Sequence, residues 1–231
     1  MSLRHALLAL LEAEPMSGYS LAKFFDQSVA YVWHAPHSQI YPELRRMEQA
    51  GMITGRSEAR GTFATKRIYS LTDDGRAELA RWVEELSPLP RERDAAYLKS
   101  SYFEYGDYAS ARKHFEAHRA HHEEQRRRWE AHVKQLENRD TDLLRIRLAQ
   151  APEHLRKQVV AYKVHVYHGL IERAKQEVRW ALAGLRMVDE LEAETVAARP
   201  APAGTPRKAV ERTKSAGPPT RVSRRHEPPR R

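Results

Sequence analysis

The stretch from His37 to Thr72 constrains the fold more than any other part of the chain. Its first part holds three apolar residues at helical spacing, namely Ile40, Leu44 and Met47. This spacing places one apolar stripe on a helix. Two extended runs follow at 52–58 and 66–71, and the loop between them is too long for a tight hairpin. A helix that leads into such a two-stranded ribbon predicts a winged helix.

Both ends of the first helix in this stretch carry local signals. Ser38 offers the side-chain oxygen of an N-cap, Pro42 suits a first turn, and Gly51 favours the left-handed backbone that ends a helix. The stripe leaves an outer polar face, which we expect to consist of Gln39, Glu43, Arg45, Arg46 and Gln49. Thr72 is expected to cap a further helix at 73–85, with Leu79, Trp82, Val83 and Leu86 on its buried side.

Three segments, in this order along the chain, resemble the PadR-like transcriptional regulators. They are SGYSLAKFF at 17–25, SQIYPELRRMEQAGMI at 38–53 and KRIYSLTDDGRAEL at 66–79. Two later segments, AAYLKSSYFEYGDYASARKHFEAH and TDLLRIRLAQAPEH, are similar to the C-terminal helical domain of the long subgroup of that family. The resemblance implies an N-terminal winged helix-turn-helix that binds double-stranded DNA, and a C-terminal coiled-coil domain that forms a homodimer.

The positive charge of the chain is concentrated at its C-terminal end. Residues 199–231 hold ten lysines and arginines and two glutamates, which accounts for +8 of the net +9. Residues 38–70 carry a local charge of +3, and this local excess is the better sign of a DNA-reading surface. The chain has no cysteine, which excludes disulfides and cysteine-based zinc fingers and favours a reducing cytosol.

The chain is expected to be mainly α with a small β-wing, in three parts. Residues 1–88 form the winged-helix domain, and their first helix carries Leu3, Leu7, Leu10 and Leu11 at amphipathic spacing. Residues 89–197 form a helical dimerisation domain with helices at 91–105, 108–137, 141–149 and 152–194. Residues 198–231 are rich in proline and arginine, and we expect them to be a disordered basic tail. The long apolar stripe of the last helix needs a partner, which favours a homodimer.

The predicted DNA-binding residues lie on the second helix, on the reading helix and on the wing. They are Ser17, Tyr19, Ser38, Gln39, Tyr41, Arg45, Arg46, Lys66 and Arg67. In a helix-turn-helix the second helix crosses the DNA backbone, so Ser17 and Tyr19 are expected near phosphates if the resemblance holds. For Tyr19, simple packing against the core is an equally open alternative.

Two clusters in the C-terminal half have a functional and a structural interpretation. His114, His118 and His121 share one helix face and could bind a transition metal, but a packed or solvated histidine face is the simpler interpretation, so no metal is expected. Four aromatic residues could line an effector pocket between the helices of a dimer, or could be ordinary core residues: Phe115, Trp129, Tyr162 and Tyr167.

The sequence shows no nucleophile motif and no glycine-rich phosphate loop, so we expect no enzyme and no cofactor. No apolar run reaches the roughly 20 residues of a membrane span. We expect a cytoplasmic, nucleoid-associated repressor that binds an inverted-repeat operator as a homodimer and is released by a small-molecule effector. The alternative is an interaction or structural module whose basic tail binds acidic partners without sequence specificity.

Overall fold

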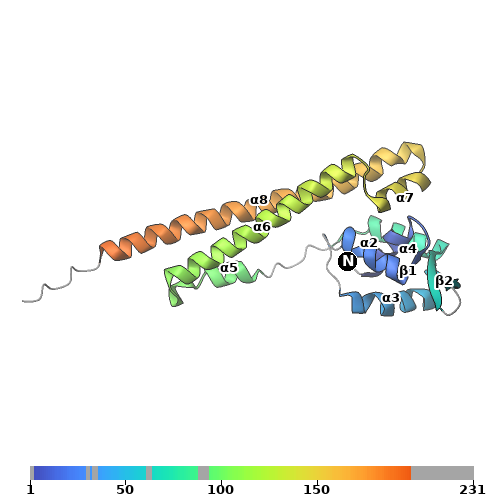
Figure 1. Ribbon diagram of the computed structural model, residues 1–231, viewed down its shortest axis with the longest axis horizontal. Coiled ribbons are helices and arrows are strands. Elements are labelled where there is room, and N and C mark those ends of the chain that lie inside the picture. The colour runs from blue at the N-terminus through green and yellow to red at the C-terminus, as the bar shows by residue number, and fades with distance from the viewer. Residues whose placement is uncertain (1–2, 30–31, 33–35, 61–63, 88–93, 199–231) are drawn as a thin grey trace, which may run out of the picture.

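A winged-helix head and a long helical rod make up the molecule, as Figure 1 shows. The computed structural model describes residues 3–29, 32, 36–60, 64–87 and 94–198. The predicted tail from residue 199 onward lies outside the described residues, as do the tip of the wing and the expected domain boundary near residue 88. The predicted fold class is confirmed, because the described elements are helices apart from one small sheet.

Within the described residues the head consists of four helices and a three-stranded antiparallel sheet. Its helices are α1 (Leu3–Leu11), α2 (Gly18–Gln27), α3 (His37–Gln49) and α4 (Asp73–Glu84). The sheet contains β1 (Met16–Ser17), β2 (Ile53–Arg60) and β3 (Ala64–Leu71), in the spatial order β1-β3-β2. The two long strands form the predicted ribbon, in which Ile53 pairs with Leu71. The short strand β1, which was not predicted, pairs Met16 with Tyr69.

The apolar stripe of α3 forms the centre of the head's core. Ile40, Leu44 and Met47 are each fully buried, as predicted from their spacing. Burial of a side chain of this size stabilises a fold by about 1.5–3 kcal/mol, so the stripe fixes α3 firmly against α1 and α2. Gly51 has a φ of 73° directly after the helix, which confirms the predicted left-handed terminator.

The start of α3 differs from the prediction. The helix begins at His37, and Pro36 takes the N-cap position without a side-chain hydrogen bond. Ser38 therefore lies within the first turn and does not cap the helix, and Pro42 lies inside the helix. Pro36 has extended backbone with φ fixed near −61°, which suits an N-cap residue even though it offers no side-chain acceptor.

Glu43 was predicted on the outer face of α3 but is buried, with 9% of its surface exposed. Its carboxylate accepts hydrogen bonds from Arg4 of α1 at 3.3 Å and from Arg46 at 2.8 Å. A buried carboxylate is tolerated when it is paired in this way, and the partner on α1 could not be foreseen from the spacing within α3. Val83 of α4 and Leu86, just after α4, were expected to be buried, but 71% and 98% of their surfaces are exposed in the single chain.

The rod is built on two long helices that run antiparallel (Figure 1). They are α6 (Tyr108–Glu137) and α8 (Glu153–Ala197), joined through α7 (Asp142–Gln150). These bounds agree closely with the predicted helices. The predicted helix at 91–105 is wrong: α5 (Ala95–Ser100) ends early and a short 3-10 turn, η2 (Phe103–Tyr105), follows. The η2 turn places the Phe103 ring against Phe115, with ring centroids 5.4 Å apart, and this contact stabilises the turn.

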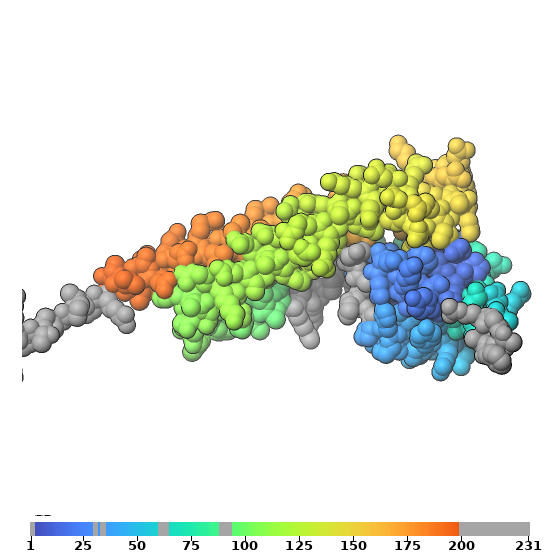
Figure 2. Space-filling model, in the orientation of Figure 1, coloured from blue at the N-terminus to red at the C-terminus, as the bar shows by residue number. Residues whose placement is uncertain are grey.

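The rod rests on the head through α7 and one end of the long helix pair (Figures 1 and 2). Leu143 and Ile146 of α7 pack against the core of the head. The hydroxyl of Tyr167 on α8 donates a hydrogen bond of 3.1 Å to the carbonyl of Ser28, just after α2. This junction leaves α3 on the side of the head that faces away from the rod. Among the described residues, no helix combines the length and apolar character needed to cross a membrane.

Candidate nucleic-acid interface

The outer face of α3 is polar and open to solvent. All five of the predicted DNA-binding residues on α3 are exposed: Ser38, Gln39, Tyr41, Arg45 and Arg46. Tyr41 has 49% of its surface exposed although it carries a large ring. A helix buried on one side by its apolar stripe and open on the other is the arrangement with which a helix-turn-helix enters the major groove.

A hollow of about 700 Å³ lies beside this face, between the start of α2, the middle of α3 and the base of the wing. Its lining consists of Ser17, Gly18, Tyr19, Ser20, Tyr41, Lys66, Arg67 and Tyr69. The fold therefore brings together five predicted residues from three separate segments. Gly18, Ser20 and Tyr69 were not predicted, because only the fold brings them next to Tyr41 and the wing.

Two of these lining residues owe their place to local structure at the start of α2. The hydroxyl of Ser17 caps α2 by accepting a hydrogen bond of 3.1 Å from the backbone N–H of Ser20. Gly18 is in close contact with α3, since a Cβ atom there would come within 2.6 Å of the Tyr41 ring. Tyr19 has 74% of its surface exposed, so it does not pack against the core in the single chain.

The wing is tied to α3 through one carboxylate. Glu48 accepts a hydrogen bond of 2.5 Å from Arg67 of β3 and one of 2.9 Å from the backbone N–H of Gly55. The hydrogen bond to Glu48, followed by the Coulomb attraction of the same group, raises the pKa of Arg67. Lys66 lies 3.4 Å from Glu58 across the ribbon, and both side chains are about half exposed.

The predicted cations differ in how freely they can meet a phosphate. Arg46 is paired with the buried Glu43, and Arg67 is paired with Glu48. Within the described part of the chain Arg45 forms no ion pair, and its side chain is exposed on the outer face of α3. Arg45 is therefore the cation of this surface that needs to break no contact before it binds an anion.

The four aromatic residues predicted to line an effector pocket do not all lie together in the single chain. Phe115 packs on Trp180 near one end of the rod, whereas Trp129 and Tyr167 belong to a separate cluster nearer the head. Tyr162 has 66% of its surface exposed. An i to i+4 stripe on a long helix distributes residues along its whole length, so helical spacing alone could not bring them to one cavity.

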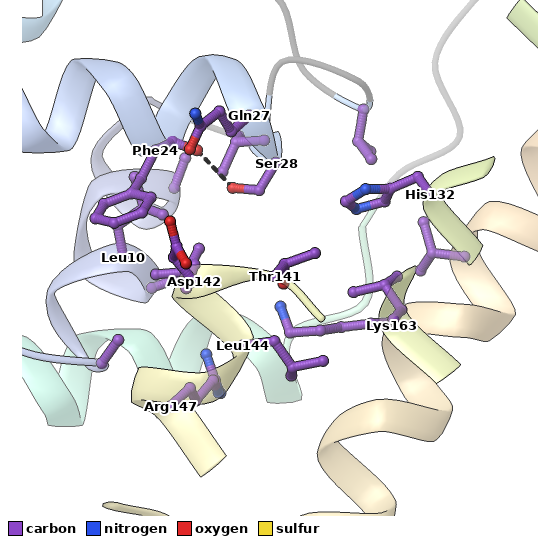
Figure 3. A pocket seen from close by; sticks show the side chains of 18 of the residues that line it. Leu10, Phe24, Gln27, Ser28, His132, Thr141, Asp142, Leu144, Arg147 and Lys163 are labelled. Atoms are coloured by element: carbon purple, nitrogen blue, oxygen red, sulfur yellow. Dashed lines mark hydrogen bonds between the residues drawn. The ribbon is translucent and has the colours of Figure 1, made fainter. Parts of the chain in front are cut away.

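A cavity of about 320 Å³ lies instead at the junction of head and rod (Figure 3). Of the four aromatic residues, Tyr167 alone lines it. Most of its lining is apolar and comes from α1, α2, α7 and α8. Lys163 and Arg147 also line it, and Figure 3 shows the Lys163 side chain extending into the space. Burial, and then the charge of Arg147, lower the pKa of Lys163 to about 8.

The three predicted histidines do not meet as one set. His114 is exposed and its ring stacks on Phe103, and His121 is exposed. His118 instead lies beside His122 and a carboxylate from the other long helix, Glu177. Sequence spacing alone could indicate the histidine pair one turn apart, but gave no sign of the residue on α8.

Comparison with known proteins identifies the head. The sequence profile of the "Transcriptional regulator PadR-like family" matches residues 7–81. The "Negative transcriptional regulator PadR" of Bacillus subtilis (strain 168) is 38% identical over 101 residues, a match that covers 44% of this chain and 56% of that protein. The chain thus matches about half the length of this curated relative.

Two solved structures extend the similarity into the rod. Bacillus subtilis PadR in complex with operator DNA has a TM-score of 0.64 and 28% identity, covering 80% of this chain and 98% of that one. The same protein in complex with p-coumaric acid has a TM-score of 0.51 and 29% identity, covering 81% and 98%. The winged-helix head, the rod of long helices and these matches agree: residues 7–81 match the PadR-like family of transcriptional regulators, and the chain is similar in fold to PadR over 80% of its length.

Proposed function

We propose that the chain is a sequence-specific DNA-binding repressor and that α3 reads its operator. The observation that carries this proposal is the outer face of α3, where Arg45 and Tyr41 are exposed beside the hollow that Lys66 and Arg67 border. Arginine on such a helix can pair with guanine or phosphate, and the wing cations can hold the backbone. The relative that was solved with operator DNA supports this role.

Residues 1–88 would then be the DNA-binding domain and residues 89–197 the dimerisation domain. In the single chain α8 leaves apolar side chains uncovered along one side, namely Tyr162, Val166, Met187 and Leu191. Burial of these side chains between two copies of the chain would strongly favour their association. A twofold dimer would present two copies of α3 about 34 Å apart and would require an inverted-repeat operator.

The cavity between head and rod is the proposed effector site. Its apolar walls suit a small aromatic ring. Among its described lining residues, the two cations Lys163 and Arg147 exceed the one carboxylate, Asp142, and so suit a carboxylate ligand. A ligand there would touch both the head and the rod, so it could shift the position of one against the other and release the operator. The relative solved with p-coumaric acid supports an aromatic acid as the ligand class.

Operator binding by point variants tests the reading surface. We expect Arg45→Ala and Lys66→Ala to weaken binding to the DNA upstream of the protein's own gene in a gel shift. Loss of one phosphate contact should reduce the salt slope of log K by about 0.9, whereas loss of a base contact should relax specificity by about 1–3 kcal/mol at one base pair. Lys113→Ala is the matched control, because Lys113 is an exposed cation on the rod. Unchanged operator affinity in the Arg45/Lys66 double variant would contradict the proposal.

The alternative function is an interaction module whose basic tail binds acidic partners. A chain truncated after Glu194 separates the two proposals. We expect this truncation to keep the preferred operator and to lose affinity for random DNA, most visibly at low salt, where the tail's charges are least screened. Loss of all DNA binding on truncation would favour the alternative. Within the first proposal the protein acts in the cytoplasm, in association with the nucleoid.

A further inference from the structure

Two imidazoles and a carboxylate meet inside the rod, apart from both the DNA-facing surface and the effector cavity. Glu177 of α8 is buried, with 9% of its surface exposed. Its Oε2 atom lies 3.0 Å from His118 Nε2 and accepts a hydrogen bond of 3.3 Å from the hydroxyl of Tyr97 on α5. His122 follows His118 by one turn on α6, with ring centroids 4.4 Å apart.

These three residues have the geometry of a metal site. One ligand atom from each of His118, His122 and Glu177 lies within 4.8 Å of the other two. Zinc bound to nitrogen and oxygen at about 2.0–2.2 Å in a tetrahedron separates its ligand atoms by about 3.3–3.6 Å. The distance of 3.0 Å between His118 and Glu177 is already close to that range. We propose that His118, His122 and Glu177 bind a divalent transition-metal ion of the zinc class.

The burial of Glu177 is the second observation that points to a cation. A buried carboxylate is costly unless it is paired. Among the described residues, Glu177 forms no ion pair with a lysine or an arginine, and its polar partners are the His118 ring and the Tyr97 hydroxyl. A divalent ion between the two rings and the carboxylate would supply the missing positive charge.

The donor set selects the class of ion. Two imidazole nitrogens with one carboxylate suit Zn²⁺, Co²⁺ or Ni²⁺, whereas Mg²⁺ and Ca²⁺ prefer sites made only of oxygen. A fourth position is left for water or another ligand.

Tyr97 would support the site from the second coordination shell. Its ring stacks on Trp180 of α8 at 4.2 Å, and its hydroxyl donates to Glu177. Carboxylates that bind metals are oriented by such hydrogen bonds. Because Tyr97 lies on α5, the first described helix after the head, a bound ion would connect α5, α6 and α8 at one point.

Titration with Co²⁺ tests the site in the full-length protein after treatment with a chelator. We expect one Co²⁺ per chain, with the strong visible absorption of a tetrahedral complex, and displacement of Co²⁺ by Zn²⁺. His122→Ala and Glu177→Gln should abolish this absorption. His114→Ala is the matched control on the same helix and should retain it. His121 lies outside the proposed ligand set although its ring contacts the His122 ring at 5.0 Å, so His121→Ala should retain it as well. Tyr97→Phe should weaken Zn²⁺ binding by about 10–100-fold, measured by competition with a chromophoric chelator.

The Co²⁺ absorption of the variants, compared with that of the wild-type chain, decides whether the site exists. Circular dichroism verifies that each variant folds. If Glu177→Gln does not fold, His122→Ala decides alone, because its ring is only partly buried. The proposal is overturned if the wild-type chain binds no Co²⁺ in stoichiometric amount. It is also overturned if the absorption persists in His122→Ala, or if it is lost to the same extent in His114→Ala and His121→Ala.

Discussion

Glu48 of α3 and Arg67 of β3 are joined by a hydrogen bond of 2.5 Å, and this bond ties α3 to the wing. The same carboxylate oxygen accepts the backbone N–H of Gly55 on β2 at 2.9 Å. A Cβ atom at position 55 would come within 2.4 Å of Arg67 and 2.5 Å of Glu48, so the contact requires glycine there. One acidic side chain of α3 thus contacts both long strands of the wing.

Replacement of Glu48 by alanine should loosen the wing. The half-buried N–H of Gly55 loses its acceptor, which we expect to lower the free energy of unfolding by about 1 kcal/mol. Operator affinity should also fall, because the wing is no longer held against α3. Urea denaturation and a gel shift measure the two effects. Glu58→Ala is the control, since Glu58 pairs only across the ribbon with Lys66 and should change stability by less than about 0.5 kcal/mol.

Two glycines on α8 provide a matched test of packing in the rod. A Cβ atom at Gly184 would come within 2.5 Å of the buried Phe115 ring, whereas one at Gly169 would meet no atom within 4 Å. We expect Gly184→Ala to lower the free energy of unfolding by about 1–3 kcal/mol through overpacking. Gly169→Ala should raise it by up to about 1 kcal/mol, because alanine favours a helix. Thermal melting that showed equal shifts for both variants would contradict the close contact between α6 and α8.

Local signals in the sequence predicted most of the fold. The stripe of Ile40, Leu44 and Met47 and the terminator Gly51 are properties of one helix and its end, so they could be read without knowledge of the rest. The end of α5 could not be predicted in this way, because it depends on the contact between Phe103 and Phe115, which lies on another helix.

The site residues divide in the same way. The exposure of Arg45 follows from its place opposite the apolar stripe of α3. The burial of Glu43 depends on Arg4 of α1, and the metal-site geometry depends on Glu177 of α8. The sequence of one helix does not show which residue of another helix will contact it, so such pairings can be identified only from the fold.

Association through α8 can be tested with two adjacent residues. Met187 has 48% of its surface exposed and lies on the uncovered apolar side of α8, whereas the neighbouring Arg186 is an exposed polar residue. Met187→Glu should weaken dimerisation at least tenfold, because burial of a methionine contributes about 1.5–3 kcal/mol and each dimer holds two copies. Arg186→Glu introduces the same side chain and should leave association unchanged. Sedimentation equilibrium gives both constants, and a wild-type chain that sediments only as a 26.7 kDa species would exclude the dimer.

Lys163 should make effector binding depend on pH. Its pKa of about 8 leaves it mostly charged at pH 7, where its ammonium can pair with a carboxylate in the cavity. We expect the affinity for an arylcarboxylate to be nearly constant from pH 6 to pH 7. Above about pH 8 the affinity should fall by up to tenfold per pH unit as the ammonium loses its proton. The probe should lack a phenol group, so that only the protein titrates. Calorimetry across this range measures the effect.

Replacement of Lys163 by methionine should remove both the affinity for the arylcarboxylate and its pH dependence. Lys157→Met, which changes an exposed lysine of the same helix, is the control.

The lowered pKa of Lys163 also affects the stability of the protein without ligand. Between about pH 8 and the ordinary lysine value of 10.5, the unfolded chain binds more protons at this position than the folded chain does. The free energy of unfolding contributed by Lys163 must therefore rise with pH across this window, and the rise should be absent in Lys163→Met. An arylcarboxylate that binds Lys163→Met with wild-type affinity would place the anionic group of the ligand elsewhere.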